Sequence, residues 1–325
     1  GGAHVFDLAD LGNLGLSPTL QGLLLIAIII AFGIKMPLVP LHTWLPDAYG
    51  EASAPVAILL GGILSKLGTY GLFRFGLQLF PQAWAASAGF LAWWGAVAVL
   101  TGALTAIAQK DIKRMVAYSS IGHMGYILLG MSAATTISLT GVVLQMISHG
   151  LILALLFDAV GLVERKVGTR DLDVLNGLLN PIRGLPTVSA LLILGGMASA
   201  GIPGLIGFVA EFLIFQGTYT DFPLPTVIAI TGTGLTAVYF VILLNRTCFG
   251  KLDNKTAYYP RVQAWERIPG YILTGLIVWF GIQPMGILQW PQSLAAYLST
   301  QVASSPSSVL VAHATAEVNH ASPHS

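Results

Sequence analysis

Charged side chains are scarce in this sequence: lysine, arginine, aspartate and glutamate together make up 9% of the 325 residues. In a soluble domain they make up about 25%. Hydrophobic residues make up 55%, and the mean hydropathy is +0.77. Because a chain this apolar would not stay in solution, the composition predicts a membrane protein. The formal net charge is +1, which argues against nucleic acid as a partner.

Cysteine is nearly absent as well. Cys248 is the single cysteine, which excludes a disulfide framework and a cysteine-ligated cluster or zinc site. The sequence also lacks a phosphate-binding loop, a cofactor motif and paired catalytic carboxylates with a base. No signal-peptide pattern precedes the first apolar run, and the first residue is Gly1, so we expect that the start of a longer protein is missing. These absences favour ion movement over bond making.

Long apolar runs are abundant instead. A bilayer is crossed by about 20 largely apolar helical residues, and we predict eight spans: 19–45, 52–75, 86–108, 112–131, 136–162, 186–219, 225–247 and 268–285. The first and sixth spans are predicted to be interrupted. Residues 1–18 are predicted as a luminal segment and 19–285 as the transmembrane domain. Residues 286–325 are predicted to begin as an interfacial helix and to end in a disordered tail, whose three histidines lack an ordered metal-ligand spacing.

The cations predict how the spans are oriented. The connections after the first, third, fifth and seventh spans hold twelve lysines and arginines, whereas Arg74 is alone on the other side. Lys35 and Lys66 lie within spans. Since cytoplasmic loops of membrane proteins carry an excess of Lys and Arg, the twelve-cation side is predicted to be cytoplasmic.

Two lysines lie inside predicted spans. A lysine in the middle of a membrane costs about 2.5–3.5 kcal/mol, so Lys66 should face a protein interior with a carboxylate or water nearby. Desolvation favours its neutral form, which would suit it to gain and lose a proton. The alternative is a structural lysine bonded to a backbone carbonyl. Lys35, close to the helix breakers Pro37 and Pro40, could also snorkel to the interface.

Glu211 is a further charged residue within a predicted span. It follows a stretch that contains Gly201, Pro203 and Gly204, which make a continuous helix unfavourable. Helices break at membrane depth where the backbone lines a cavity or is buried in protein. Glu211 is therefore predicted to carry a proton or to pair with a buried cation. The alternative is a protonated structural glutamate that bonds across helices.

Three histidines and a further lysine complete the candidates. Histidine titrates near neutral pH and suits a proton relay, and His42, His123 and His149 lie within or beside spans. Each could equally be a hydrogen-bonded core histidine. A metal site is not predicted, because none of them pairs with a carboxylate or another histidine one turn away. Lys110 and Arg114 fit cytoplasmic anchoring with Asp111 at the helix start, while Lys113 could line a channel entry.

Five segments carry a family resemblance. The chain closely resembles the antiporter-like subunits of respiratory complex I over about residues 20 to 250, through "KMPLVPLHTWLPDA", "GILSKLGTYGLFRF", "DIKRMVAYSSIGHMGYILLG", "LQMISHGLILALLF" and "GIPGLIGFVAEF". Within the family it is similar to the M-type branch, called NdhD in the photosynthetic complex. The "GEA" after "DAY" and the "VERKVGTRDLDVL" loop resemble cyanobacterial members, including the form found in carbon-dioxide-uptake complexes.

The resemblance implies an all-α polytopic membrane bundle of fourteen helices, with two inverted five-helix repeats that each contain a broken helix. The eight spans would be the last eight. It implies relay roles for Lys35 and Lys66, an exit role for Glu211, and places for His42 and His149 on a central hydrophilic axis. The family pairs its first lysine with a glutamate of an earlier helix, which nothing in this sequence matches.

This sequence departs from the family at one motif. The usual "DAHxEAPxAGS" reads "DAYGEASAPVA" here, so Tyr49 replaces a histidine and Ser53 replaces a proline. If that histidine helps protons to enter in relatives, the entry route here differs.

The implied function is proton translocation by a subunit of a cyanobacterial photosynthetic complex I in the thylakoid membrane. Pro37 and Pro40 would open a wet cavity around Lys35, and the proton would pass to Lys66, then through His149 and water to Glu211. No cofactor is expected in this chain, whereas plastoquinone, iron–sulfur clusters and a ferredoxin donor would belong to other subunits. Expected partners are neighbouring antiporter-like subunits, lipids and, in the uptake form, a carbon-dioxide-hydrating module. A multisubunit cation/proton antiporter and a scaffold with a vestigial channel are the alternatives.

Overall fold

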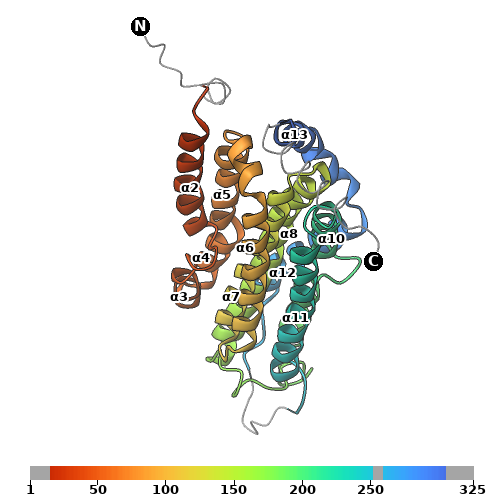
Figure 1. Ribbon diagram of the computed structural model, residues 1–325. Coiled ribbons are helices and arrows are strands. Elements are labelled where there is room, and N and C mark those ends of the chain that lie inside the picture. The colour runs from red at the N-terminus through yellow and green to blue at the C-terminus, as the bar shows by residue number, and fades with distance from the viewer. Residues whose placement is uncertain (1–14, 252–258, 305–325) are drawn as a thin grey trace, which may run out of the picture.

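Helices account for the regular structure of the residues that the computed structural model describes, 15–251 and 259–304. Figure 1 shows long, roughly parallel helices, with α2 at one side of the bundle and α11 at the other. In chain order the elements are α2 (Pro18–Lys35), α3 (Trp44–Glu51), α4 (Ala54–Leu59), η1 (Leu60–Leu64), α5 (Ser65–Gly71), η2 (Leu72–Leu77), α6 (Pro81–Ile107), α7 (Ile112–Ala133), α8 (Thr136–Val167), α9 (Pro186–Ser199), α10 (Ile206–Thr218), α11 (Pro223–Thr247), α12 (Ala264–Ile282) and α13 (Met285–Ala303).

Within residues 15–251 and 259–304, five helical segments are long and apolar enough to cross a membrane: α2, the continuous stretch Ala54–Leu77, α6, α8 and α11. The pair α12 and α13, bent by 69°, adds a sixth if it is one span. The eight predicted spans also included the residues of α7, α9 and α10. The helix α7 is almost wholly buried, and α9 and α10 are each shorter than a span. The expected luminal segment lies mostly in residues 1–14 and the expected disordered tail in 305–325, both outside the described residues.

Both interruptions expected from the sequence coincide with gaps between helices. The helix α2 ends at Lys35, and the chain turns through residues 36–43 before α3 begins at Trp44. The break between α9 and α10 covers residues 200–205 and contains Gly201 and Gly204, whose φ angles are +67° and +92°. Glycine adopts positive φ without a steric penalty, so these two residues let the backbone leave helical geometry between α9 and α10.

Glycines bring α6 and α7 into close contact along the centre of the bundle. A Cβ atom on Gly95 would lie 2.8 Å from the carbonyl oxygen of Gly125, and a Cβ on Gly102 would overlap the backbone nitrogen of Gly122. Small residues at such positions let two membrane helices approach backbone to backbone. The helix α7 is therefore enclosed by protein, and its polar residues Ser119, Ser120 and His123 are buried.

Most of the ion pairs lie at the end of the bundle where α6, α8 and α11 finish, which we call the cation-rich side. The side chain of Asp111 caps α7 by accepting a hydrogen bond from the backbone nitrogen of Lys113 at 2.8 Å. The exposed carboxylate of Asp173 lies 2.8 Å from Lys110 Nζ and 2.8 Å from a guanidinium nitrogen of Arg246. The hydrogen bond from Lys110 lowers the pKa of Asp173 below its ordinary value. These pairs tie the connections on this side to one another.

Candidate functional site: a buried series of titratable side chains

Lys66 lies on α5 between two π-helical turns, η1 and η2, and is 8% exposed. Its Nζ atom donates to the carbonyl oxygen of Gly61 in η1 and to Ser65 Oγ at 3.2 Å. It also lies 2.7 Å from Nδ1 of His149 on α8. A lysine ammonium has only donors, so a charged Lys66 requires Nδ1 of His149 to be an unprotonated acceptor.

Gly150 explains why His149 can reach Lys66. A Cβ atom on Gly150 would lie 2.9 Å from the carbonyl oxygen of Gly62, so only glycine lets α8 pack this closely against η1. The other ring nitrogen of His149, Nε2, is buried and has no hydrogen-bond partner among the described residues. The His149 ring lies 5.1 Å from the His123 ring of α7, centroid to centroid.

His123 connects the lysine half of the cluster to the glutamate half. Its Nε2 atom is 2.8 Å from Ser199 Oγ at the end of α9. Its Nδ1 atom is 3.2 Å from Gln145 Nε2 and 3.6 Å from Glu211 Oε1. When the Gln145 amide donates to Nδ1, the proton of a neutral His123 sits on Nε2 and is donated to Ser199. A second proton on Nδ1 would face the carboxylate of Glu211.

Glu211 is 3% exposed and lies beside the broken helix. Thr233 of α11 donates to Glu211 Oε2 at 3.1 Å, and the hydroxyl of Tyr126 lies 3.0 Å from Thr233 Oγ1. A Cβ atom on Gly201 would lie 3.0 Å from Glu211 Oε2. The break between α9 and α10 therefore supplies Ser199 to His123 and makes room for the carboxylate.

A cavity of about 590 Å³ reaches Glu211 from the side of α10 and α11. Its walls are mostly aromatic and aliphatic, and they include Phe208, Phe212 and Tyr219 as well as Gly201 and Thr233. The carboxylate is thus enclosed by protein on the His123 side and lies next to an open volume on the other.

The two other predicted relay residues lie outside this series. Lys35 is exposed at the end of α2, and Pro37 and Pro40 lie in the turn that follows it. His42 is half-buried, and its Nδ1 atom has no hydrogen-bond partner among the described residues. The series that the structure brings together is Lys66, His149, His123 and Glu211, which are contributed by α5, α8, α7 and α10.

Sequence reasoning ranked His123 below His149 and did not select Ser199, Thr233 or Tyr126. The only signal for His123 was a histidine one turn after Ser119 and Ser120 in an apolar span. Its actual neighbours come from three other helices, so no local spacing could reveal them. Tyr49 is fully buried and packs edge-on against Phe157, with ring centroids 5.6 Å apart.

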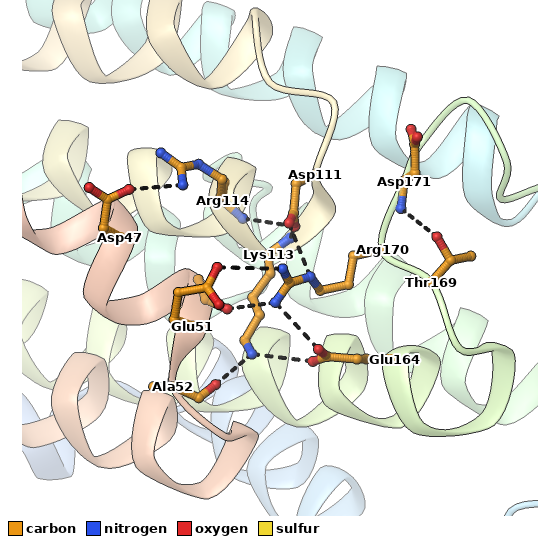
Figure 2. Close-up of polar contacts among 11 residues, drawn as sticks. Asp47, Glu51, Ala52, Asp111, Lys113, Arg114, Glu164, Thr169, Arg170 and Asp171 are labelled. Carbon is orange, nitrogen blue, oxygen red and sulfur yellow. Dashed lines mark hydrogen bonds and ion pairs between the residues drawn. The ribbon is translucent and has the colours of Figure 1, made fainter.

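Lys113 belongs to an ion-pair network on the cation-rich side (Figure 2). It is 2% exposed, and its Nζ atom donates to the carbonyl of Ala52 at 2.6 Å and to Glu164 at 3.2 Å. Arg170 donates to the carbonyl of Gly50 at 2.6 Å and pairs with Asp111 at 3.0 Å and Glu164 at 3.3 Å. Two cations therefore bind the C-terminal carbonyls of α3, where the helix dipole favours positive charge.

Replacing Arg170 with glutamine is expected to destabilise the chain. The change removes contacts to α3, α7 and α8 at once, and hydrogen bonds to charged groups are worth about 1.5–3 kcal/mol each. We expect the free energy of unfolding to fall by about 2–3 kcal/mol, measured by chemical unfolding in lipid nanodiscs. Arg165→Gln is the control, since this arginine is 56% exposed and its ion pair with Glu266 is long at 4.0 Å. Equal effects of the two changes would contradict a clamp centred on Arg170.

The described residues contain no group of three His, Cys, Asp or Glu side chains placed to hold a metal ion. The fold and the buried series together define a class: a multi-pass membrane protein with a broken helix and a line of titratable side chains through its core. The chain belongs to the family described as NADH:quinone oxidoreductase/Mrp antiporter, transmembrane, whose model matches residues 1–236. This membership confirms the resemblance on which the expectations for fold and family rested.

Relatives and solved structures agree with the family. The chain is 39% identical over 310 residues to NADH-quinone oxidoreductase subunit M of Pseudomonas aeruginosa, covering 92% of this chain and 60% of the relative. It is 44% identical over 303 residues to NAD(P)H-quinone oxidoreductase chain 4 of Prochlorococcus marinus, covering 91% and 54%. A chain of respiratory complex I from Thermus thermophilus superposes with a TM-score of 0.85 at 28% identity, covering 92% and 62%. The chain thus spans a little over half the length of the curated relatives named here, and the predicted all-α membrane fold is confirmed.

Proposed function

We propose that this chain is a proton-translocating membrane subunit of a quinone oxidoreductase complex, and that Lys66, His149, His123 and Glu211 carry the protons. The observation that carries the proposal is the buried series itself. Four titratable side chains from four different helices follow one another, with 2.7 Å between Lys66 Nζ and His149 Nδ1. Because buried ionisable groups are costly in a membrane, such a series marks an ion pathway by default.

The first transfer joins Lys66 and His149. Proton transfer requires heavy atoms about 2.6–3.2 Å apart, or one bridging water, and the Nζ to Nδ1 distance meets the direct condition. When the ammonium gives its proton to Nδ1, the imidazole becomes a cation that can release a different proton from Nε2. The lysine and the two ring nitrogens of His149 thus move one positive charge without moving any helix.

The next two transfers cross wider gaps. His149 Nε2 has no partner among the described residues, so the step to His123 needs a bridging water or a rotation of one ring. His123 Nδ1 is 3.6 Å from Glu211 Oε1, a gap that a small side-chain adjustment closes. The cavity beside Glu211 gives the proton a route out of the series. Thr233 and Gln145 act as positioning residues for the carboxylate and the imidazole.

Lys35 and His42 keep their predicted place before Lys66 within this proposal. The turn after α2 packs directly against α5, since a Cβ atom on Gly68 would lie 2.6 Å from the backbone nitrogen of Met36. A charge brought next to the exposed Lys35 would therefore act close to the helix that holds Lys66. In relatives that role is expected to fall to a carboxylate from another helix.

The finer assignment is the NdhD-type subunit of a cyanobacterial complex in the thylakoid membrane. The similarity to a Prochlorococcus relative supports it, and the "VERKVGTRDLDVL" loop supports the carbon-dioxide-uptake form. Quinone reduction, with plastoquinone, iron–sulfur clusters and a ferredoxin or NAD(P)H donor, would then take place in other subunits. Neighbouring antiporter-like subunits, lipids and a carbon-dioxide-hydrating module are the proposed partners.

The proposal predicts the ion that moves. In sealed vesicles that hold the complex purified through this chain, quinone reduction should build a pH gradient that a protonophore collapses. Replacing sodium with choline should leave the gradient unchanged. Sodium-dependent proton exchange without quinone reduction would contradict the proposal and identify a cation/proton antiporter, the other function in the family's name. Quinone reduction with no gradient would identify a scaffold.

A further inference from the structure

Asp158 is an intramembrane carboxylate that the relay does not use. It follows His149 by nine residues on α8, which is about two and a half helical turns, so the two side chains face opposite sides of the helix. His149 faces Lys66, whereas Asp158 faces α12: a Cβ atom on Gly270 would lie 3.3 Å from Asp158 Oδ2. Asp158 thus belongs to a separate place in the fold, between α8, α9 and α12.

The oxygen atoms at this place lack partners. Asp158 Oδ2 is buried and accepts no hydrogen bond from the described residues, although the side chain as a whole is half-buried. Thr274 lies one turn beyond Gly270 on α12, and its hydroxyl oxygen is likewise buried without a partner. A side chain on α8 leans toward the N-terminus of that helix, and because α8 and α12 run in opposite directions, Asp158 leans toward Thr274.

The helix α12 contains a proline and a glycine where it passes Asp158. Pro269 lies inside it and has no N–H group to donate to the carbonyl of Trp265. Gly270 follows directly, and any side chain there would also meet Leu191 of α9, at 2.5 Å from a Cβ atom. Pro269 leaves the carbonyl of Trp265 without its helical donor, and Gly270 places backbone rather than a side chain next to the carboxylate of Asp158.

The charges around Asp158 do not neutralise it. Toward the cation-rich side, Lys166 lies 2.8 Å from Glu266 of α12 and is engaged by that carboxylate. Arg165 is 56% exposed and 4.0 Å from Glu266, and its charge acts on Asp158 without a hydrogen bond to Oδ2. The helix α9 carries no charged residue between Pro186 and Ser199. A buried carboxylate oxygen that receives no hydrogen bond, and whose cation neighbour is solvent-exposed, favours a bound proton over the ionised form.

We propose that Asp158, together with Thr274, forms a proton-binding site between α8 and α12 that exchanges with the compartment on the cation-rich side. A hydronium ion gives its proton to Asp158 Oδ2, which leaves a carboxylic acid and a water molecule, and the release step is the reverse. The new O–H group can donate to the Thr274 hydroxyl or to a carbonyl of α12. The site lies beside the Lys166–Glu266 pair, which is the nearest ion pair on the path to that compartment.

Dicyclohexylcarbodiimide tests the proposal, because this apolar reagent adds to protonated carboxyl groups within membranes. The assembled complex in sealed vesicles is treated with the reagent, and the adducts are located by mass spectrometry. We expect an adduct on Asp158 at neutral pH. Asp158→Asn should remove that adduct and leave all others unchanged, which also shows that the variant is folded. Asp173 is the matched control, since it is exposed and paired with Lys110 and should remain unlabelled.

The pH of the two compartments is then varied independently. Raising the pH on the cation-rich side should reduce labelling of Asp158 by roughly tenfold per pH unit once the carboxyl is mostly ionised. Raising the pH on the other side should have no effect. No adduct on Asp158, labelling that is independent of pH, or labelling that follows the opposite compartment would each overturn the proposal. None of these results depends on the proposed relay, which is tested separately by the substitution Lys66→Met.

Discussion

Replacing Lys66 with methionine is expected to lower proton translocation by at least about tenfold while quinone reduction continues. Methionine has a similar length and no charge, so the change removes the proton carrier and keeps the volume. General acid–base transfer by one positioned group typically contributes about 10²–10⁴-fold to a rate. The measurement is the number of protons moved per electron in sealed vesicles that contain the assembled complex.

The stability of the Lys66→Met variant should not fall in parallel. An ammonium group in mid-membrane costs about 2.5–3.5 kcal/mol. Removing this cost should offset the loss of the hydrogen bonds that Lys66 makes to Gly61, Ser65 and His149. Lys110→Met is the matched control, because Lys110 is an exposed lysine that pairs with Asp173 outside the relay. An unchanged proton-to-electron ratio in Lys66→Met would remove this residue from the pathway.

Replacing His123 with leucine should have a comparably large effect. His123 lies between His149 and Glu211, at 5.1 Å from His149 between ring centroids and 3.6 Å from Glu211 between Nδ1 and Oε1. Leucine cannot hold a proton, so we expect translocation to fall by about tenfold or more. The measurement is again the number of protons moved per electron.

A second substitution separates carrying a proton from positioning a neighbour. Glutamine at position 123 can still hydrogen-bond to Ser199 and Gln145 but does not titrate, so His123→Gln should remain as defective as His123→Leu. Recovery of translocation in His123→Gln would show that the residue only orients Glu211.

The membrane class and most of the helices were predictable because an apolar run of about 20 residues rarely forms anything but a membrane span. Glu211 is selected as a candidate beside a predicted helix break because Gly201, Pro203 and Gly204 oppose a helix whatever the surroundings. Lys66 is selected because a lysine in an apolar run is costly. In each case the signal lies in one short segment of the chain.

The rest depended on contacts between distant segments. Arg170 binds residues 50, 111 and 164, and nothing in its own loop distinguishes it from the other cations on that side. Asp158 was not selected, because its unpartnered oxygen becomes evident only once α12 is placed opposite. Lys35 is predicted as a relay residue, with snorkelling to the interface as the alternative, and its exposure at the end of α2 within this chain depends on which segments pack beside it.

The π-helical turn η1 has a consequence for how Lys66 is held. A backbone that closes over five residues directs the carbonyl of residue 61 toward residue 66, whereas an ordinary α-helix would direct it toward residue 65. The Gly61 carbonyl of this turn accepts from Lys66 Nζ and also from Ser65 Oγ. The main chain itself therefore serves as the resident ligand of the ammonium, and point substitution cannot delete an oxygen that belongs to the peptide backbone. Only shortening or lengthening the helix would turn that oxygen away.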